Sequence, residues 1–349
     1  TLPGEADSRS PRQAGSLSDI FRRSLMRAKS KTTVIEWDTR LAESKRRRRI
    51  YCVINCRAGS AADIQRETLR QAFADHSRDY EVESIVEICA RPKSLAQIVR
   101  QAIASGADVI AAGGGDGTIS TVANQLVGTD VTLGVLPFGT LNHFAKDLGI
   151  PLDPREAVEV VCRGAIKRVD VGEVNGVYFI NNSSLGVYPE AVRVRERWRP
   201  LLGKWPALVI GAFTVLRRFP VLKLGLDIDG RRRRRRVPLL FVGNNAYSVE
   251  WPDLGERERL DEGRLSLWLV REASRLALLR SAFKLLFGRL HLASEIEALS
   301  VESLTVNSRR RRRRLRVAVD GEVIRLRAPL RYNVHPQSLS VCVPVVGSG

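Results

Sequence analysis

The residues best suited to chemistry lie in the glycine-rich segment Gly113-Gly114-Gly115-Asp116-Gly117-Thr118. An apolar run at 107–112 precedes the segment, and a helical pattern at 119–127 follows it. Glycines lack a Cβ and let backbone N–H groups approach phosphate oxygens, and a helix N-terminus favours anions. The pattern therefore predicts a phosphate-binding turn between a strand and a helix. It has neither the Gly-Lys-Ser/Thr of a Walker A loop nor the GxGxxG spacing, and a structural turn capped by Asp116 is the alternative.

Two further loops follow predicted strands in the same way. The strand pattern at 132–136 ends in Pro137-Phe138-Gly139-Thr140, and the strand at 50–54 ends in Asn55-Cys56-Arg57-Ala58-Gly59-Ser60. Strands that alternate with helices form a parallel sheet whose ligands bind at the strand C-terminal ends. We therefore expect the three loops to share one site.

The three motifs resemble, in order and spacing, those of the diacylglycerol kinase catalytic family, which includes bacterial lipid kinases, sphingosine kinases and ceramide kinases. A further match is Asp320-Gly321-Glu322, where bacterial members place a carboxylate general base. The resemblance spans residues 49–345 and implies transfer of the ATP γ-phosphate to a lipid hydroxyl, with ATP as co-substrate and Mg²⁺ as cofactor. Diacylglycerol, monoacylglycerol, a sphingoid base and phosphatidylglycerol all remain open as acceptors.

The resemblance also implies roles for individual residues. It assigns catalysis to Glu322, Asp320 and Asp116, and Asp116 is also expected to face the metal. Sphingosine kinase relatives give the base role to the residue matching Asp116, but we favour Glu322. The expected ATP contacts are Asn55, Gly59, Ser60, Gly114, Gly115, Asp116, Gly117, Thr118 and Thr140.

A second metal site is expected from the family's Leu-x-x-Asp-Gly-x-Leu loop. The matching stretch is 259–265, where Glu262 occupies the Asp position and Asp261 precedes it. Both carboxylates are candidate Mg²⁺ ligands, although the sequence departs from the pattern. The family's nucleotide-contacting Thr is also absent, because Cys89-Ala90-Arg91 stands there.

The pattern of elements predicts an α/β protein in two domains. Residues 1–47 are polar, lack periodicity and are expected to form a flexible leader. Residues 48–168 are expected to form an ATP-binding domain with a three-layer parallel sheet, like that of NAD kinase and diacylglycerol kinase. Residues 169–345 are expected to form a β-rich, sandwich-like lipid-substrate domain, with helices inserted at 188–218 and 272–290. The apolar spacing in the second helix fits either packing or a membrane interface.

Charge is unevenly distributed along the sequence. The formal net charge is +19, and arginine runs at 46–49, 231–236 and 309–314 hold most of the excess. Such runs are expected to be solvated hairpin ends or flexible segments, and their field favours an anionic membrane surface over specific nucleic-acid recognition. The Cys and His residues are scattered along the sequence without the spacing of a zinc site, and free cysteines are typical of a reducing compartment.

The expected location is cytoplasmic with peripheral membrane association, because no secretory signal or membrane-length apolar run is found. A homodimer stays open. Two other functions also stay open: an NAD kinase-like enzyme, whose Asn-Glu motif is not found after residue 140, and a catalytically silent protein that binds anionic membranes or nucleic acid. The second explains the arginines but not the three loops.

Overall fold

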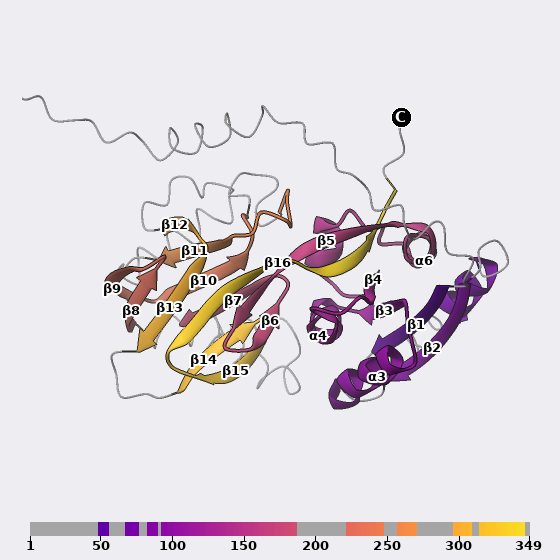
Figure 1. Cartoon of the computed structure of the whole chain (residues 1–349), viewed down its shortest axis with the longest axis horizontal. Helices are drawn as coiled ribbons and strands as arrows, with labels where there is room; N and C mark the ends of the chain where they lie inside the picture. Colours follow the sequence, from indigo (N-terminus) through magenta and orange to yellow (C-terminus); the bar gives the residue numbers. More distant parts are fainter. Residues whose placement is uncertain are drawn as a thin grey trace, which may run out of the picture. The chain divides into compact units, whose positions relative to one another are not determined.

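The computed structural model describes residues 48–55, 67–76, 82–89, 92–186, 221–247, 257–270, 296–308 and 314–345 (Figure 1). All of them belong to one compact unit, Glu43–Gly349. The expected leader at 1–47 and the expected helices at 188–218 and 272–290 lie outside the described residues.

The first half of the described chain alternates strands and helices. Residues 67–76 are helical, and the named elements are β1 (Arg48–Asn55), β2 (Val82–Cys89), α3 (Pro92–Ala104), β3 (Val109–Gly114), α4 (Asp116–Leu126), β4 (Thr132–Pro137), α5 (His143–Asp147) and α6 (Pro154–Arg163). Strands β2, β1, β3 and β4 pair in that order, all parallel. Every residue of β3 and β4 is buried, as expected for a parallel sheet covered on both faces.

Helices cover this parallel sheet from both sides. Helices α3 and α4 contact each other on one side, and α6 packs on β4 from the other (Figure 1). Local sequence explains where α6 begins: Asp153 accepts hydrogen bonds from the N–H groups of Arg155 and Glu156, and Pro154 occupies the first helical position. On β4, Gly134 leaves room for α6, since a Cβ there would lie 2.9 Å from Val161 Cγ2.

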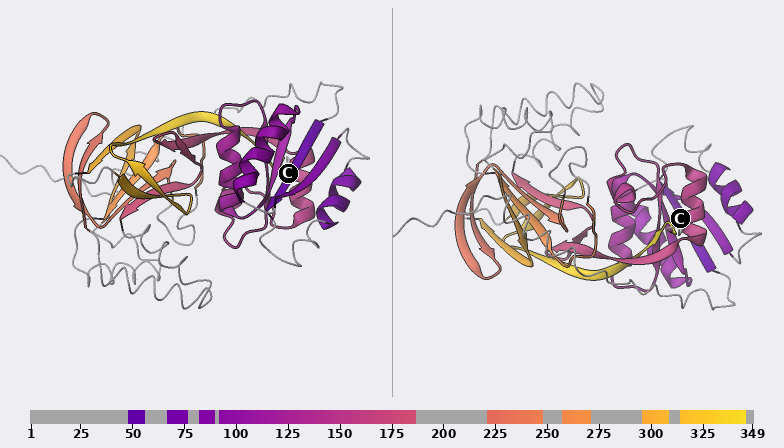
Figure 2. Two further views of the ribbon diagram at one scale, coloured as in Figure 1. Left: turned by 90° about the horizontal axis from the view of Figure 1, so that it is seen from below. Right: turned by 90° about the horizontal axis from the view of Figure 1, so that it is seen from above.

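The second half is rich in β-strands. It contains β5 (Ala165–Val174), β6 (Val177–Phe179), β7 (Asn182–Gly186), β8 (Leu222–Ile228), β9 (Arg231–Val237), β10 (Leu239–Asn244), β11 (Leu265–Val270), β12 (Ile296–Val301), β13 (Ser303–Ser308), β14 (Arg314–Val319), β15 (Glu322–Arg327) and β16 (Leu330–Val343). Among the described strands, one sheet has the order β12-β11-β10-β7-β14-β15. It packs against β16, β13 and β8 through a shared core that includes Leu226, Val242, Val306, Val317 and Tyr332 (Figure 2). This is a β-sandwich.

The two halves share one sheet. Strand β16 pairs in parallel with β4 through Val341 and Leu133, and it also pairs antiparallel with β5 and β13. Strand β5 runs across the domain boundary expected at residues 168 and 169. The chain therefore returns from the sandwich to the edge of the parallel sheet, which brings distant segments against the expected phosphate loops.

Two Asp-Gly pairs form tight hairpin turns. Asp229-Gly230 joins β8 to β9 with φ of 46° and 79°, and Asp320-Gly321 joins β14 to β15 with φ of 43° and 85°. Positive φ at both central residues favours the Asp-Gly pair at a tight hairpin turn. The second hairpin places Glu322 at the first position of β15.

The arginine run at 231–236 is a regular strand, which the sequence did not predict. It forms β9 at the edge of its sheet, paired only with β8 among the described strands. Arg233 and Arg235 face Glu297 of β12, at 3.5 and 3.8 Å. Charged residues on an edge strand discourage pairing with another chain, and this gives a structural reason for the run.

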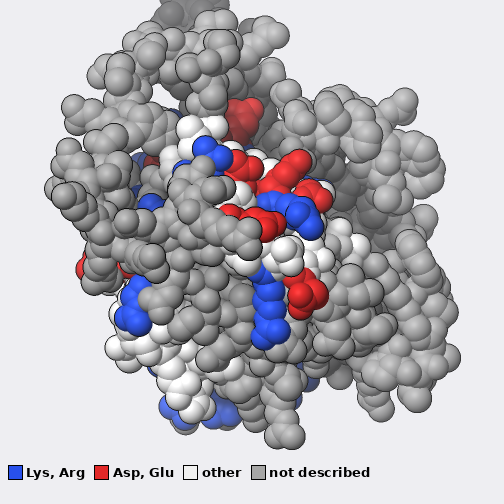
Figure 3. All heavy atoms as spheres, turned by 90° about the vertical axis from the view of Figure 1, so that its right-hand side faces the viewer, with Lys and Arg blue, Asp and Glu red and all other residues white. Residues whose placement is uncertain are grey.

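The described charges on one face are mixed in sign. Figure 3 shows acidic and basic side chains interspersed where described residues reach that surface. The described part of this face therefore has no continuous basic patch of the kind that binds nucleic acid. Of the described helices, none combines the length and apolar character needed to cross a membrane.

Candidate active site

The glycine-rich turn lies between β3 and α4, where the sequence predicts it. Gly115 is the extended N-cap residue of α4, and its carbonyl accepts hydrogen bonds from the N–H groups of Thr118 and Ile119. A Cβ on Gly114 would lie 2.6 Å from Cβ and Oγ1 of Thr118, so only glycine fits there. By contrast, a Cβ on Gly117 would meet no atom of the described residues within 4 Å. The turn is thus closely packed at Gly114 and open at Gly117.

The loop after β4 packs directly against this turn. Phe138 N–H donates to the Gly114 carbonyl at 3.0 Å, and a Cβ on Gly139 would lie 2.7 Å from Gly115 Cα. Asn142 fixes the loop from inside: its Oδ1 accepts from Gly139 N–H at 2.9 Å, and its Nδ2 donates to the carbonyls of Pro137 and Gly139. The two loops therefore form one rigid unit.

The polar residues expected around the turn divide into three groups. Asn55 Nδ2 donates to Thr118 Oγ1 at 3.0 Å, which joins the end of β1 to α4. Asp116 is half-buried, and its Oδ1 accepts a 3.4 Å hydrogen bond from Phe144 N–H of α5. Thr140 is exposed on the second loop, whereas Gly59 and Ser60 lie outside the described residues.

Asp320 is bound to four donors. Its Oδ2 accepts hydrogen bonds from Ser120 Oγ at 2.6 Å and Ile180 N–H at 2.9 Å, and its Oδ1 accepts from the N–H groups of Asn181 and Asn182 at 2.9 and 3.0 Å. Burial raises the pKa of the Asp320 carboxyl, and these hydrogen bonds act in the opposite direction. Because both oxygens are engaged, Asp320 anchors the hairpin that carries Glu322.

Glu322, two residues further on, is exposed at the start of β15. Its hairpin is attached through Asp320 to Ser120, which lies one turn into α4. The structure therefore connects the expected base to the helix that begins at the glycine-rich turn, across 200 residues of sequence.

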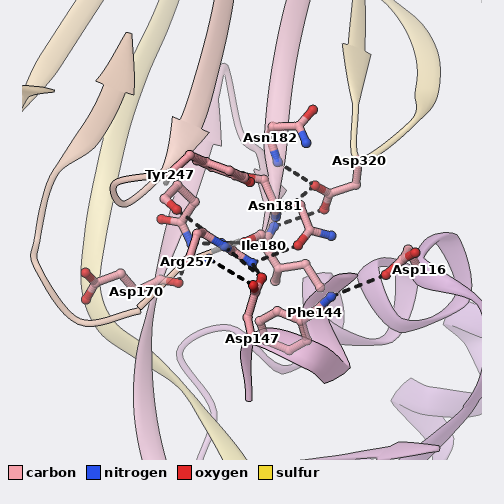
Figure 4. Close-up of polar contacts among 11 residues, drawn as sticks. Asp116, Phe144, Asp147, Asp170, Ile180, Asn181, Asn182, Tyr247, Arg257 and Asp320 are labelled. Carbon is pink, nitrogen blue, oxygen red and sulfur yellow. Dashed lines mark hydrogen bonds and ion pairs between the residues drawn. The ribbon is translucent and has the colours of Figure 1, made fainter. Parts of the chain in front are cut away.

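A buried arginine lies beside this anchor. The Arg257 side chain is fully buried and donates to Asp147 Oδ2 through Nε and Nη2, at 2.9 and 2.6 Å. Its Nη1 donates to the carbonyls of Ile180 and Asn244, and its Nη2 also donates to Asn181 Oδ1 at 2.8 Å (Figure 4). Asp147 ends α5, just after the second loop.

Comparison with known proteins identifies the family. Residues 49–174 match the family model of the diacylglycerol kinase catalytic domain, and residues 184–343 match that of the YegS C-terminal NAD kinase beta sandwich-like domain. The diacylglycerol kinase of Bacillus subtilis (strain 168) is 30% identical over 234 residues, which cover 66% of this chain and 76% of that protein. This chain belongs to the diacylglycerol kinase catalytic-domain family. The family predicted from the sequence motifs is therefore confirmed.

A further relative and a solved structure are also similar to this chain. The diacylglycerol kinase of Staphylococcus aureus (strain bovine RF122 / ET3-1) is 30% identical over 224 residues, covering 62% of this chain and 68% of that protein. A crystal structure of a diacylglycerol kinase from Bacillus anthracis str. Sterne has a TM-score of 0.63 at 18% identity, covering 86% of this chain and 98% of that one. The predicted fold, a parallel-sheet α/β region followed by a β-rich sandwich, is confirmed.

The residues expected at the family's second metal site have other partners here. Asp261 Oδ1 accepts a hydrogen bond from Arg259 Nε at 3.1 Å, and Glu262 Oε2 accepts one from Ala246 N–H at 3.2 Å. Within the described ranges, no group of three or more His, Cys, Asp or Glu residues is placed to hold a metal ion. Arg259 and Asp261 also form an ion pair near the surface.

The structure brings together most of the described candidates and adds others. Asn55, Asp116 and Thr118 meet at the glycine-rich turn, and Asp320 joins them through Ser120. Asp261 and Glu262 contact none of these residues through a hydrogen bond or ion pair in the described part of the chain. Sequence reasoning missed the structural roles of Ser120, Asn142, Asp147, Asn181 and Arg257. Asn142 and Asp147 follow the second motif within seven residues, but nothing in the sequence pattern singles out Arg257.

Proposed function

We propose that this protein is an ATP-dependent lipid kinase that transfers the γ-phosphate to a hydroxyl of a membrane lipid such as diacylglycerol. The observation that carries the proposal is the Ser120–Asp320 hydrogen bond, 2.6 Å long, which attaches the Glu322 hairpin to the helix that starts at the glycine-rich turn. In this proposal the anchored hairpin presents the Glu322 carboxylate to the phosphates bound at the helix N-terminus. A lipid kinase needs both a site that holds the ATP phosphates and a base that accepts the proton of the lipid hydroxyl.

The residues at the turn fit a nucleotide phosphate. The first-turn N–H groups of α4, at Asp116 and Gly117, have no acceptor within the helix, and the missing Cβ of Gly117 leaves space beside them. We assign phosphate binding to Gly114, Gly115, Gly117 and Thr118, and further nucleotide contacts to Asn55, Gly59, Ser60 and Thr140. In this assignment residues 48–168 bind ATP and 169–345 bind the lipid.

The proposed reaction uses the chain's own groups as follows. The lipid hydroxyl oxygen forms a bond to the γ-phosphorus as the bond to the ADP oxygen breaks, and Glu322 accepts the hydroxyl proton. Asp320 orients the hairpin, Asn142 holds the second loop in shape, and Phe138 N–H joins that loop to Gly114. Asp116 would hold Mg²⁺, since a hard cation takes oxygen ligands and no described residue forms a hydrogen bond or ion pair with its Oδ2. When bound, the ion would neutralise charge on the β- and γ-phosphates.

We also propose that the protein works from the cytoplasm at an anionic membrane surface. Cross-strand pairs Arg314–Arg327 and Arg316–Arg325 lie on one face of the β14–β15 hairpin, and all four residues are exposed. Each arginine near an anionic bilayer contributes about 1 kcal/mol of attraction. Arg325→Gln/Arg327→Gln is expected to weaken sedimentation with phosphatidylglycerol vesicles. The control Arg155→Gln/Arg163→Gln on α6, which removes the same charge, is expected to sediment like wild type.

Turnover decides the proposed function. The full chain is incubated with γ-labelled ATP, Mg²⁺ and mixed micelles of diacylglycerol, monoacylglycerol, sphingosine or phosphatidylglycerol, and with NAD in a separate arm. Label is expected in one of the lipids and not in NAD. Label in NAD alone would replace the proposal with the NAD kinase-like alternative that the second matched domain suggests. The absence of labelled product in every arm, with ATP intact, would favour a silent binding protein.

A further inference from the structure

The short segment that joins β6 to β7 is bonded on both sides of its backbone. The N–H groups of Ile180, Asn181 and Asn182 all donate to Asp320. The carbonyl of Ile180 accepts from Arg257 Nη1 at 2.7 Å and from Asn244 Nδ2 at 3.1 Å, while the Asn181 carbonyl accepts from Tyr247 Oη. Asp320 therefore binds the N–H groups of all three residues, and Arg257 binds Ile180 and Asn181 from the other side (Figure 4).

Arg257 has a complete set of partners. The guanidinium donates to Asp147, to two carbonyls and to Asn181 Oδ1, and it lies 5.3 Å from the centroid of the Tyr247 ring. The Asp147 side chain is 4% exposed, so this ion pair is removed from water at both ends. A planar guanidinium has five N–H donors in a fixed plane and can make all of these hydrogen bonds at once, whereas a lysine ammonium cannot.

These contacts close a ring that begins and ends on α4. Asp116, the first residue of α4, accepts from Phe144 of α5, and Asp147 at the end of α5 binds Arg257. Arg257 binds Ile180, Ile180 binds Asp320, and Asp320 binds Ser120, again on α4. The expected phosphate-binding residues lie at one point of this ring and the Glu322 hairpin at another.

Resting on the proposed function, we propose that Arg257 is a positioning residue for phosphoryl transfer. By holding Asp147 to the 180–182 segment, it fixes the second phosphate loop and α5 relative to the hairpin that carries Glu322. None of the described partners of the Arg257 side chain is a residue assigned to phosphate binding or to proton transfer. Its effect is on the distance and angle between the hydroxyl proton acceptor and the bound phosphates, where a displacement of about 1 Å lowers the rate by about 10²-fold.

The test variant is Arg257→Lys, which keeps the charge and loses the fork geometry. Its matched control is Arg264→Lys. Arg264 donates to the Ser300 hydroxyl, the Glu302 carboxylate and the Ser300 carbonyl, and these described partners lie within the sandwich half. For Arg257→Lys we expect kcat, calculated from the concentration of protein that binds nucleotide, to fall about 10- to 100-fold. The KM for ATP should stay within twofold of the wild-type value. Arg264→Lys should keep wild-type kcat. Equal kcat values for the two variants would overturn the proposal, as would loss of ATP affinity in step with kcat.

A second measurement does not depend on turnover. Asn181→Ala removes one of the two side-chain acceptors of Arg257 Nη2 and leaves Asp147 in place, so it is a milder change than Arg257→Lys. Amide hydrogen exchange in Asn181→Ala is expected to speed up at 143–148 and 179–183 together, with β4 at 132–137 unchanged. Unchanged exchange at 143–148 would refute the coupling, whether or not Arg257→Lys folds. If wild type phosphorylates no lipid, the proposed function fails and this exchange result still decides whether Arg257 couples the two segments.

Discussion

Replacing Asp320 by Asn tests whether this residue anchors the hairpin. The substitution keeps the shape of the side chain but turns one acceptor oxygen into a donor. If Nδ2 takes the Oδ1 position, the N–H groups of Asn181 and Asn182 both lose their acceptor. If it takes the Oδ2 position, the Ser120 hydroxyl can rotate to accept, and only Ile180 N–H is left unpaired. The second orientation costs less and is the one expected.

The magnitude follows from that geometry. A buried donor left without a partner costs about 1–3 kcal/mol, and hydrogen bonds to a charged group are stronger than those to a neutral one. One unpaired N–H group and two weakened bonds to the remaining oxygen give a loss of about 3 kcal/mol in the free energy of unfolding. The loosened hairpin should also lower kcat by misplacing Glu322.

Asp229→Asn is the matched control, because Asp229 occupies the same position in the other Asp-Gly hairpin. Its Oδ1 alone accepts the N–H groups of Glu302 and Ser303, so an Asn there keeps both bonds. Asp229 is exposed, and its replacement should cost about 0.5 kcal/mol, the usual size of a surface change. Urea titration of both variants measures the difference. Equal losses in the two would refute the anchoring role of Asp320.

Three further predictions concern the base, the turn and the thiols. Glu322→Gln should lower kcat by about 10²- to 10⁴-fold in the micelle assay while the ATP dissociation constant stays near that of wild type, and full turnover would move the base role to Asp116. Gly114→Ala should destabilise the fold, because the added Cβ would clash with Thr118. Gly117→Ala should keep the wild-type urea midpoint and lose ATP affinity in calorimetry. Equal urea midpoints for the two variants would contradict the open space beside Gly117. Burial raises the pKa of the thiols of Cys52, Cys162 and Cys342 to about 12. Up to pH 9, iodoacetamide should therefore label these thiols only when the protein is unfolded in urea. Peptide mass spectrometry that finds them labelled in the native protein would contradict their burial.

Local sequence patterns predicted the parts of the site that depend on neighbouring residues. The turn at Gly114 requires glycine because of Thr118, four residues away, and the Asp320-Gly321 hairpin follows from the preference of a tight turn for positive φ. Strand β9 was missed because a run of arginines has no alternation of apolar and polar residues. Its edge position, its pairing with β8 and its ion pairs with Glu297 stabilise it instead.

The sequence by itself determined the family, the order of elements and the three loops, because these follow from motif spacing and from apolar periodicity over short distances. The tertiary structure alone decided which distant groups meet. Strand β16 returns to the parallel sheet, Asp320 reaches Ser120 across 200 residues, and Arg257 reaches Asp147 across 110. Those pairings depend on the crossing of two sheets and on burial that forces each charge to find a partner, and no local pattern encodes either.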